Sequence, residues 1–333
     1  MKIDKTTVVV ITGASSGIGH AAALRFAKSG AVVVLAARRE HVLNDVAREC
    51  EEKGAAEVMV VPTDVTQKEA VRELADKVVE RFGKIDVWVN NAAVSMFARF
   101  EEAPDHLFRR VIETNLFGYI YGIRAALPHM REQGRGTIIN VSSVVAGAPQ
   151  PYTSAYVASK YAINGLTECL RMELALDEAP EIQVCTVMPA SIDTPLFSNA
   201  ANYTGRAVKA LDPVYTPEHV ARTIVSVAKN PERRAISGEA GRMMLIQHTL
   251  LPGLYEKIGA QNVDNNHLKK EPAEPGEGNL FNPSVHTGTR DGWREKQVKP
   301  VQAYAAFGAT AAVGLSLAWF AGKRLMKIGG LSD

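Results

Sequence analysis

Short apolar runs alternate with longer amphipathic segments over the first two thirds of the chain. The short runs are almost continuous in valine and isoleucine, as expected of strands that are buried on both faces. In the longer segments apolar residues recur every three or four positions, which is the spacing of a helix with one buried face. We expect strands at residues 7–12, 31–36, 57–61, 85–89, 137–141 and 182–187. We expect helices at residues 17–28, 41–53, 68–82, 105–131, 155–178 and 217–229.

Strict alternation of strand and helix predicts a doubly wound α/β domain, in which a parallel sheet is covered by helices on both faces. We place this Rossmann-fold domain at residues 1–251. The apolar run behind the charged N-terminus is too short for a signal peptide, and we interpret it as the first strand. This domain is therefore expected to face the cytoplasm.

The character of the sequence changes after residue 251. Residues 252–300 are rich in proline, glycine and charge, and we expect an irregular extension there. Residues 301–322 carry no charge and are flanked by lysine and arginine. As a helix, about 20 such residues would cross the hydrocarbon core of a bilayer. We expect a transmembrane anchor at 301–322 followed by a basic tail at 323–333; a soluble helix docked on the domain, in a soluble cytoplasmic protein, is the alternative.

Composition narrows the function classes. The 333 residues have a net charge of +2, which gives no electrostatic basis for binding nucleic acid. The three cysteines, Cys50, Cys169 and Cys185, are far apart and lack the spacing of a zinc site. They favour a reducing compartment and no metal centre.

A glycine-rich loop follows the first expected strand and leads into the first helix, over Thr12, Gly13, Ala14, Ser15, Ser16, Gly17, Ile18 and Gly19. Gly13 permits a tight turn, Gly17 allows close approach of a pyrophosphate, and Gly19 allows the helix to pack against the sheet. The free N–H groups of the helix N-terminus, with the hydroxyls of Ser15 and Ser16, can bind the diphosphate of a dinucleotide.

The second expected strand ends in Arg38 and Arg39, where a carboxylate would select NAD. A guanidinium group suits a 2′-phosphate, so we expect NADP(H), with Arg38 as the main contact and Arg39 as its helper. The alternative is that both arginines simply begin a solvated helix. Asp64, followed by Val65 after the third strand, can hydrogen-bond the adenine amino group.

Several polar residues lie where a doubly wound sheet binds its ligands. Asn91 and Ala92 follow the fourth strand, and Ser143 follows the fifth. Asn115 shares an i,i+4 row with Val111, which puts an amide on or near an apolar helix face, where it needs partners.

Tyr156 and Lys160 are an i,i+4 pair on the helix expected at 155–178. A phenol has a pKa of about 10, and an adjacent ammonium group favours the phenolate. We therefore expect Lys160 to lower the pKa of Tyr156 and make it a proton donor or acceptor. Alone, such a pair is more often an ordinary amphipathic helix face.

Together these residues resemble the short-chain dehydrogenase/reductase superfamily over roughly residues 5–251. The resemblance rests on the glycine loop, on Asn90, Asn91 and Ala92, and on the position of Ser143 thirteen residues before Tyr156. It implies that Ser143 polarises the substrate carbonyl, that Tyr156 exchanges the proton, and that Lys160 also holds the nicotinamide ribose. It further implies that Asn115 fixes a water that links Lys160 to solvent, and that Thr194 reaches the nicotinamide carboxamide.

The family's usual glycine after Ala92 is Ala93 here, and because a small residue is kept we expect little effect. Its glycine after Pro189 is Ala190, whose added methyl group is expected to shift the loop and its backbone contacts to the nicotinamide slightly. The predicted catalytic residues are Ser143, Tyr156, Lys160 and Asn115. The predicted cofactor contacts are Gly13, Ser15, Ser16, Gly17, Ile18, Gly19, Arg38, Arg39, Asp64, Val65, Asn91, Ala92, Tyr156, Lys160, Pro189, Ile192 and Thr194.

These features predict an NADP(H)-dependent oxidoreductase that reduces a carbonyl group or oxidises a secondary alcohol. We expect Ser95, Met96, Val145, Tyr152 and the segment 192–211 to line a mostly apolar substrate pocket. A lipophilic substrate would suit the expected membrane anchor, and the resemblance implies a homodimer or homotetramer. The alternative is a dinucleotide-binding regulator or scaffold at a membrane, which does not turn over its cofactor.

Overall fold

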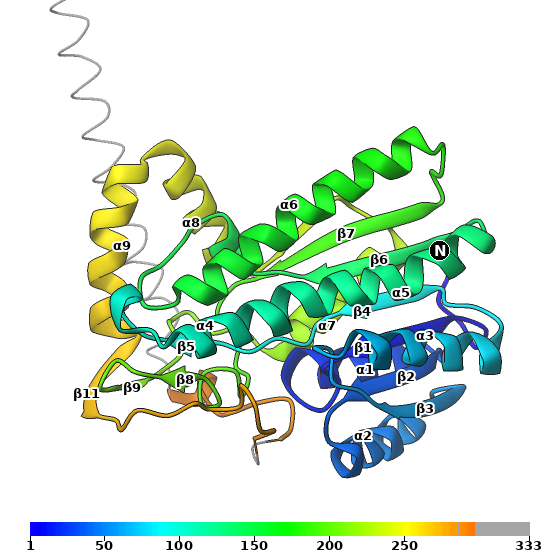
Figure 1. Cartoon of the computed structure of the whole chain (residues 1–333), viewed down its shortest axis with the longest axis horizontal. Helices are drawn as coiled ribbons and strands as arrows, with labels where there is room; N and C mark the ends of the chain where they lie inside the picture. Colours follow the sequence, from blue (N-terminus) through cyan, green and yellow to red (C-terminus); the bar gives the residue numbers. More distant parts are fainter. Residues whose placement is uncertain (285–286, 297–333) are drawn as a thin grey trace, which may run out of the picture.

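The computed structural model describes residues 1–284 and 287–296 (Figure 1). A seven-stranded sheet with strand order β10-β7-β6-β4-β1-β2-β3 forms the centre, and all of its neighbouring strands are parallel. Its strands are β1 (Val8–Thr12), β2 (Val32–Ala37), β3 (Glu57–Pro62), β4 (Val87–Asn90), β6 (Gly136–Val141), β7 (Ile182–Pro189) and β10 (Arg234–Ser237). The predicted doubly wound fold is confirmed, as are the six predicted strands.

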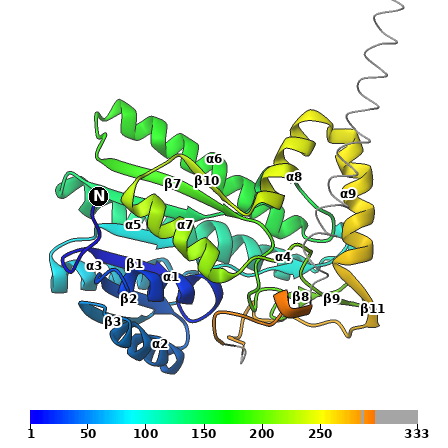
Figure 2. The same cartoon turned by 180° about the vertical axis from the view of Figure 1, so that it is seen from behind.

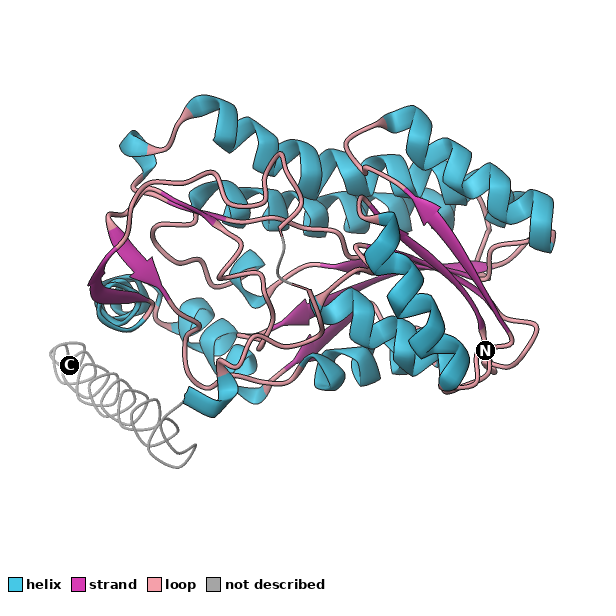
Figure 3. Ribbon diagram, turned by 90° about the horizontal axis from the view of Figure 1, so that it is seen from below, coloured by secondary structure: helices cyan, strands magenta, loops and turns pink. Residues whose placement is uncertain are grey.

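Nine α-helices occur in the described part of the chain. They are α1 (Gly17–Ala27), α2 (Glu40–Glu52), α3 (Lys68–Phe82), α4 (Asp105–Ile112), α5 (Gly118–Glu132), α6 (Ser154–Leu176), α7 (Pro217–Lys229), α8 (Glu239–Leu250) and α9 (Pro252–Asn266). Figure 3 shows the strands as a twisted layer with helices on either side. Short 3-10 turns occur at η1 (Phe100–Glu102), η3 (Val144–Ala146) and η4 (Arg294–Lys296).

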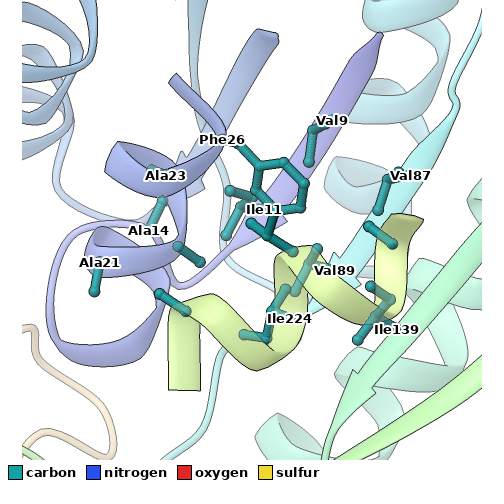
Figure 4. Packing of buried hydrophobic residues seen from close by; sticks show 14 of the residues in the cluster. Val9, Ile11, Ala14, Ala21, Ala23, Phe26, Val87, Val89, Ile139 and Ile224 are labelled. Atoms are coloured by element: carbon teal, nitrogen blue, oxygen red, sulfur yellow. The ribbon is translucent and has the colours of Figure 1, made fainter. Parts of the chain in front are cut away.

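Each face of the sheet has its own apolar core. Helices α1, α2 and α7 cover one face (Figure 2), where Phe26 of α1 and Ile224 of α7 pack on Ile11, Val89 and Ile139 (Figure 4). Helices α3, α5 and α6 cover the other face (Figure 1). The strands contribute to both cores in alternation, which explains why their sequences are apolar at nearly every position.

The helix predicted at 105–131 is interrupted by a π-helical turn, η2 (Glu113–Phe117), between α4 and α5. Such turns are frequent at functional sites because they rotate one side chain out of the regular helical register. Here the turn contains Asn115, which is completely buried.

The prediction of an irregular extension over 252–300 is wrong for its first part. Residues Pro252–Asn266 form α9, which packs beside α8, and Leu268–Pro272 form strand β11, which pairs with β9 (Arg206–Val208). Pro252 stands at the first helical position, where no N–H group is needed, so it starts a helix instead of breaking one. Only Val263 of α9 is buried, so the helix has no apolar stripe that a sequence pattern could reveal.

A second small sheet joins β5 (Met96–Phe97) to β8 (Ala201–Asn202). In the part of the chain that the structure describes, no helix combines the length and the apolarity that crossing a bilayer requires. The predicted span 301–322 and the basic tail 323–333 lie outside the described residues.

Candidate active site

A cavity of about 670 Å³ opens at the carboxyl edge of the sheet, where the loops after β1, β2, β4, β6 and β7 meet. All the predicted cofactor contacts except Gly19 line this cavity, together with the predicted catalytic residues Ser143, Tyr156 and Lys160. Asn115 and Gly19 lie behind its wall. The structure thus brings together residues that are up to about 180 positions apart, as expected for the ligand crevice of a doubly wound sheet.

The glycine loop packs tightly against the end of β4. Gly13 has a φ of +67°, and a Cβ atom on Gly19 would lie only 2.2 Å from the carbonyl oxygen of Gly13. Gly19 was predicted to let the helix pack against the sheet; the atoms nearest to its Cβ position belong instead to Gly13 and Asn91, so it lets α1 pack closely behind the glycine loop. Asn91 Nδ2 donates to the carbonyl oxygen of Thr12 at 2.9 Å, so this amide supports the loop.

Three guanidinium groups gather at the end of the cavity next to β2 and β3. Arg38, Arg39 and Arg110 all line it, and Asp64 is the carboxylate among them. Arg110 Nη2 lies 3.5 Å from Asp64 Oδ2, and Arg39 Nη2 donates to Ser15 Oγ at 3.2 Å. Burial lowers the pKa of Arg38, which the positive charges of Arg110 and Arg39 lower further while Asp64 opposes them. The excess of positive charge makes this end of the cavity suitable for an anion.

The carboxylate of Asp64 is already well hydrogen-bonded. Its Oδ1 accepts from the backbone N–H of Thr66 at 2.9 Å and from the Thr66 hydroxyl at 2.8 Å. Burial raises its pKa, but these hydrogen bonds and the charges of Arg110 and Arg38 hold the pKa below its ordinary value. Asp64 therefore stays ionised beside the arginines.

Tyr156 and Ser143 face each other at the centre of the cavity. Ser143 ends the segment after β6, and its Oγ accepts from the N–H of Val145 at 3.3 Å. Burial raises the pKa of Tyr156 to about 12, against the lowering effect of a hydrogen bond with Ser143. The prediction that Lys160 lowers this pKa is therefore wrong for this structure, and the Tyr156 phenol stays protonated at neutral pH.

Lys160 explains the difference, because its ammonium group is engaged elsewhere. Nζ donates to the carbonyl oxygen of Val141 at 2.9 Å and to the hydroxyl of Tyr119 at 3.3 Å, and lies 5.4 Å from the centroid of the Tyr156 ring. The side chain is 1% exposed, and burial lowers the pKa of Lys160 to about 7.

Tyr119 was missed by sequence reasoning. It is 1% exposed, and its hydroxyl donates to Val141 O at 2.8 Å while it accepts from Lys160. Its position four residues after Asn115 continues the row from Val111, and this spacing is the signal that could have found it.

Asn115 does not touch Lys160 directly. Its Oδ1 accepts from Val94 N at 2.9 Å, and its Nδ2 donates to Val94 O at 3.0 Å and to Ser159 Oγ at 3.1 Å. The predicted need of this amide for partners is confirmed. The contacts tie the loop after β4 to helix α6, one residue before Lys160.

The substrate end of the cavity differs in part from the expectation. Ser95, Val145, Leu196, Phe197 and Leu211 line it as expected, and Phe97 lines it as well. Met96 and Tyr152 do not line the cavity. Met96 of β5 packs into a buried apolar cluster, and the Tyr152 hydroxyl donates to Asp264 Oδ1 at 2.7 Å. Side chains of α8 and α9 complete the lining, among them Met244, Gln247, Leu251, Leu254, Tyr255, Ile258, Asn262 and Val263.

A doubly wound sheet with a glycine loop after its first strand and a serine, a tyrosine and a lysine in one cavity is typical of dinucleotide-dependent oxidoreductases. The family described as short chain dehydrogenase matches residues 7–204, which is more than half of the chain. The chain belongs to this family of oxidoreductases.

Individual relatives match more of the chain than the family does. The chain is 35% identical to the uncharacterized oxidoreductase YxnA of Bacillus subtilis over 97% of its own length and 92% of the relative's. It is 39% identical to the 11-beta-hydroxysteroid dehydrogenase A of Sesamum indicum over 68% of its own length and 66% of the relative's.

Two solved structures share the fold. An alcohol dehydrogenase from the archaeon Thermococcus sibiricus, complexed with 5-hydroxy-NADP, matches with a TM-score of 0.60 and 31% identity over 69% of this chain and 94% of the other. A short-chain dehydrogenase from Streptomyces avermitilis matches with a TM-score of 0.63 and 30% identity over 73% of this chain and 92% of the other.

Proposed function

We propose that the protein is an NADP(H)-dependent oxidoreductase that reduces the carbonyl group of a lipophilic substrate, or oxidises the corresponding secondary alcohol. The observation that carries the proposal is the meeting of Ser143, Tyr156 and Lys160 in one cavity, with the arginines at its other end.

The residues of the cavity fit a dinucleotide. The glycine loop brings the N-terminus of α1 to the cavity. Gly17 N donates to the carbonyl oxygen of Gly288 at 2.9 Å, so the next N–H groups of the helix, with Ser15 and Ser16, would bind a diphosphate. Ser191 follows β7 and lines the same cavity, and its buried hydroxyl has no partner among the described residues. A buried polar atom without a partner is costly, so a ligand that hydrogen-bonds Ser191 would be favoured.

Three side chains would act on the substrate and its proton. Hydride would come from the nicotinamide when the cofactor is bound. Ser143 would donate a hydrogen bond to the substrate oxygen and stabilise the charge that develops there. Tyr156, protonated at neutral pH, would give its proton to the same oxygen. Lys160 would hold the ribose hydroxyls and replace the proton of Tyr156.

Asn115 would act through the others. Its hydrogen bonds tie the loop after β4 to Ser159 and so would fix the position of the neighbouring Lys160 relative to that loop. Its proposed share in a water-linked proton path to Lys160 rests on the family resemblance.

The preference for NADP(H) is supported by the charges around β2. Arg38, Arg39 and Arg110 line this end of the cavity together with the carboxylate of Asp64, whereas a site for the 2′-hydroxyl of NAD would end β2 with an acidic residue. The relative from Thermococcus sibiricus was solved with an NADP derivative. Arg38→Ala should therefore weaken NADPH far more than NADH.

A lipophilic substrate is supported by the lining of the other end. The lysines and arginines of the described lining are Arg38, Arg39, Arg110 and Lys160, all among the cofactor-side residues. His267 also lines the cavity, but burial lowers its pKa to about 4, so it is neutral at physiological pH. A substrate carboxylate would find no cation there, while the relative from Sesamum indicum carries the name of a steroid dehydrogenase.

The test is an assay in which the protein reduces a panel of ketones with NADPH, and the loss of the NADPH absorbance measures the rate. Each hydrophobic ketone is paired with an analogue that carries a carboxylate. We expect turnover of the neutral ketones, with a lower kcat/KM for the charged analogues. NADPH binding without turnover of any carbonyl would instead favour a dinucleotide-binding regulator.

Two further parts of the proposal concern assembly. Phe117, Tyr161, Met172 and Leu176 leave large apolar side chains exposed on η2 and α6, which supports the predicted homodimer or homotetramer. Size-exclusion chromatography with light scattering tests this.

For the predicted anchor at 301–322, the full chain should partition into membranes and a chain that ends at residue 299 should not.

A further inference from the structure

The described part of the extension returns to the cofactor end of the cavity. After β11 the chain runs back along the domain toward its N-terminal half (orange in Figure 1). We use the name strap for residues 278–284, which lie outside the part of the chain that matches the family. Leu280 anchors the strap: it is fully buried, in a cluster with Val94 and Leu107.

The backbone carbonyls of the strap point at the three arginines. Arg38 Nη1 donates to Phe281 O at 2.7 Å, and Arg38 Nη2 donates to Asn279 O at 2.9 Å. Arg39 Nη1 donates to Ser284 O, and Arg110 Nε donates to Leu280 O at 2.9 Å. Arg110 also lies over the Phe281 ring at 5.3 Å. Four consecutive or nearly consecutive carbonyls thus hold three guanidinium groups.

These contacts orient the arginines without neutralising them. A carbonyl oxygen accepts a hydrogen bond but carries no net charge, and each guanidinium group has five N–H donors. The two bonds from Arg38 fix its plane and leave further donors for another acceptor. The strap therefore holds positive charge in place beside the cavity.

The strap is also a wall of the cavity and does not fill it. Asn279, Leu280 and Ser284 line the same cavity as Arg38 and Arg39. Asn279 Oδ1 is buried and has no hydrogen-bond partner among the described residues. A hydrogen-bond donor of a ligand bound in the cavity would satisfy this oxygen.

We propose that the strap is the second half of the binding site for the 2′-phosphate of NADP(H), because it holds Arg38 and Arg39 in the orientation that receives the phosphate. The arginines supply the charge, and the strap supplies their preorganisation. Without the strap, two long side chains must be ordered by the cofactor itself, which weakens binding. NADH has no phosphate at this position and depends little on the strap. The inference rests on the proposed preference for NADP(H).

Gly278, the first residue of the strap, and Gly276, two positions before it, give a matched pair of variants. Gly278 has a φ of +55°, and a Cβ atom there would lie 2.3 Å from the carbonyl oxygen of Asn199 and 2.5 Å from Ala200 C. Both neighbours are backbone atoms, so Gly278→Ala must displace the strap. A Cβ atom on Gly276 would meet nothing within 4 Å, so Gly276→Ala leaves the strap in place. Neither glycine lines the cavity.

The experiment titrates the full-length protein and both variants with NADPH and with NADH, by quenching of intrinsic fluorescence. We expect Gly278→Ala to raise the Kd for NADPH about tenfold, as the loss of two preorganised side chains implies. The Kd for NADH should change by less than about twofold, and Gly276→Ala should match the unsubstituted protein. Gly276→Ala should also keep the kcat of the unsubstituted protein at saturating NADPH, and far-UV circular dichroism reports whether both variants are folded.

Three results would overturn the inference. If Gly278→Ala weakened the binding of NADPH and NADH equally, the strap would contribute to cofactor binding without selecting the phosphate. If the variant bound NADPH more tightly, the strap carbonyls would compete with the phosphate for the arginines. No change in either Kd would remove the strap from the site. Should Gly278→Ala fail to fold, Leu280→Ala releases the buried anchor and should give the same selective loss.

The proposed function fails separately. If the unsubstituted protein binds NADPH and NADH equally well, the preference for NADP(H) is wrong before any variant is made. A preference that survives unchanged in Gly278→Ala contradicts only the role of the strap.

Discussion

The buried ammonium group of Lys160 should make the protein less stable than it would be with an apolar residue at that position. Burial lowers the pKa of Lys160 from 10.5 to about 7, whereas the unfolded chain keeps the ordinary value. Between these two pH values the unfolded state binds the extra proton, so the contribution of this residue to stability rises with pH. Below about pH 7 the folded state holds a buried charge, and the full penalty of about 4 to 5 kcal/mol is present.

Lys160→Met removes this penalty with a side chain of similar length. The variant also loses the hydrogen bonds to Val141 O and Tyr119 Oη, which stabilise the native lysine by about 1 to 3 kcal/mol together. We expect the variant to be more stable than the unsubstituted protein by about 2 to 3 kcal/mol at pH 6. Near pH 9, about 2 kcal/mol of the penalty remains, so the two proteins should be about equally stable.

Urea unfolding at pH 6 and pH 9, followed by circular dichroism, measures both differences. The matched control is Lys68→Met, because Lys68 is exposed at the start of α3 and its replacement should change stability by less than about 0.5 kcal/mol at either pH. If Lys160→Met is less stable than the unsubstituted protein at pH 6, or if its advantage does not shrink toward pH 9, the burial argument is wrong.

Two further substitutions test the support of the site. Tyr119→Phe removes an acceptor from the Lys160 ammonium group, so the pKa of Lys160 should fall. The decline of kcat/KM with rising pH should then occur about one pH unit lower than in the unsubstituted protein, while the Kd for NADPH stays the same. A pH profile that does not shift would contradict this. Gly19→Ala places a Cβ atom 2.2 Å from Gly13 O and should abolish NADPH binding in a titration, whereas Gly165→Ala, where a Cβ atom meets nothing within 4 Å, should bind normally. Retained binding in Gly19→Ala would show that the loop tolerates the shift.

Where a local pattern carries the information, the sequence predicted the sheet well, and it predicted most of the residues that meet in the cavity. Five of the six predicted strands, β1, β2, β4, β6 and β7, are buried along nearly their whole length, and the edge strand β3 is mostly half-buried; all six are mainly apolar. Helices such as α2, α3 and α7 show a clear apolar stripe. Strand β10 was missed because Arg234 and Ser237 leave only a two-residue apolar run in Arg234–Ser237. Helices α8 and α9 were missed because few of their residues are buried, so their sequences have no single apolar face.

The chemical environment of the site depended on contacts that no local pattern contains. The i,i+4 spacing of Tyr156 and Lys160 is real, but the direction of the Lys160 ammonium group is set by Val141 on β6 and Tyr119 on α5. The two arginines after β2 were found from their position. Their engagement by residues 279–284 could not be, because it joins segments about 240 positions apart through backbone carbonyls, which carry no sequence signature.

The most direct test of the proposed chemistry is Tyr156→Phe, which removes one hydroxyl from the cavity and leaves the ring in place. We expect this variant to bind NADPH with the Kd of the unsubstituted protein and to lose carbonyl reduction by at least about a hundredfold, because proton transfer by a positioned side chain contributes that much or more. Full activity in Tyr156→Phe with unchanged NADPH binding would show that the proton comes from another group and would contradict the proposed mechanism.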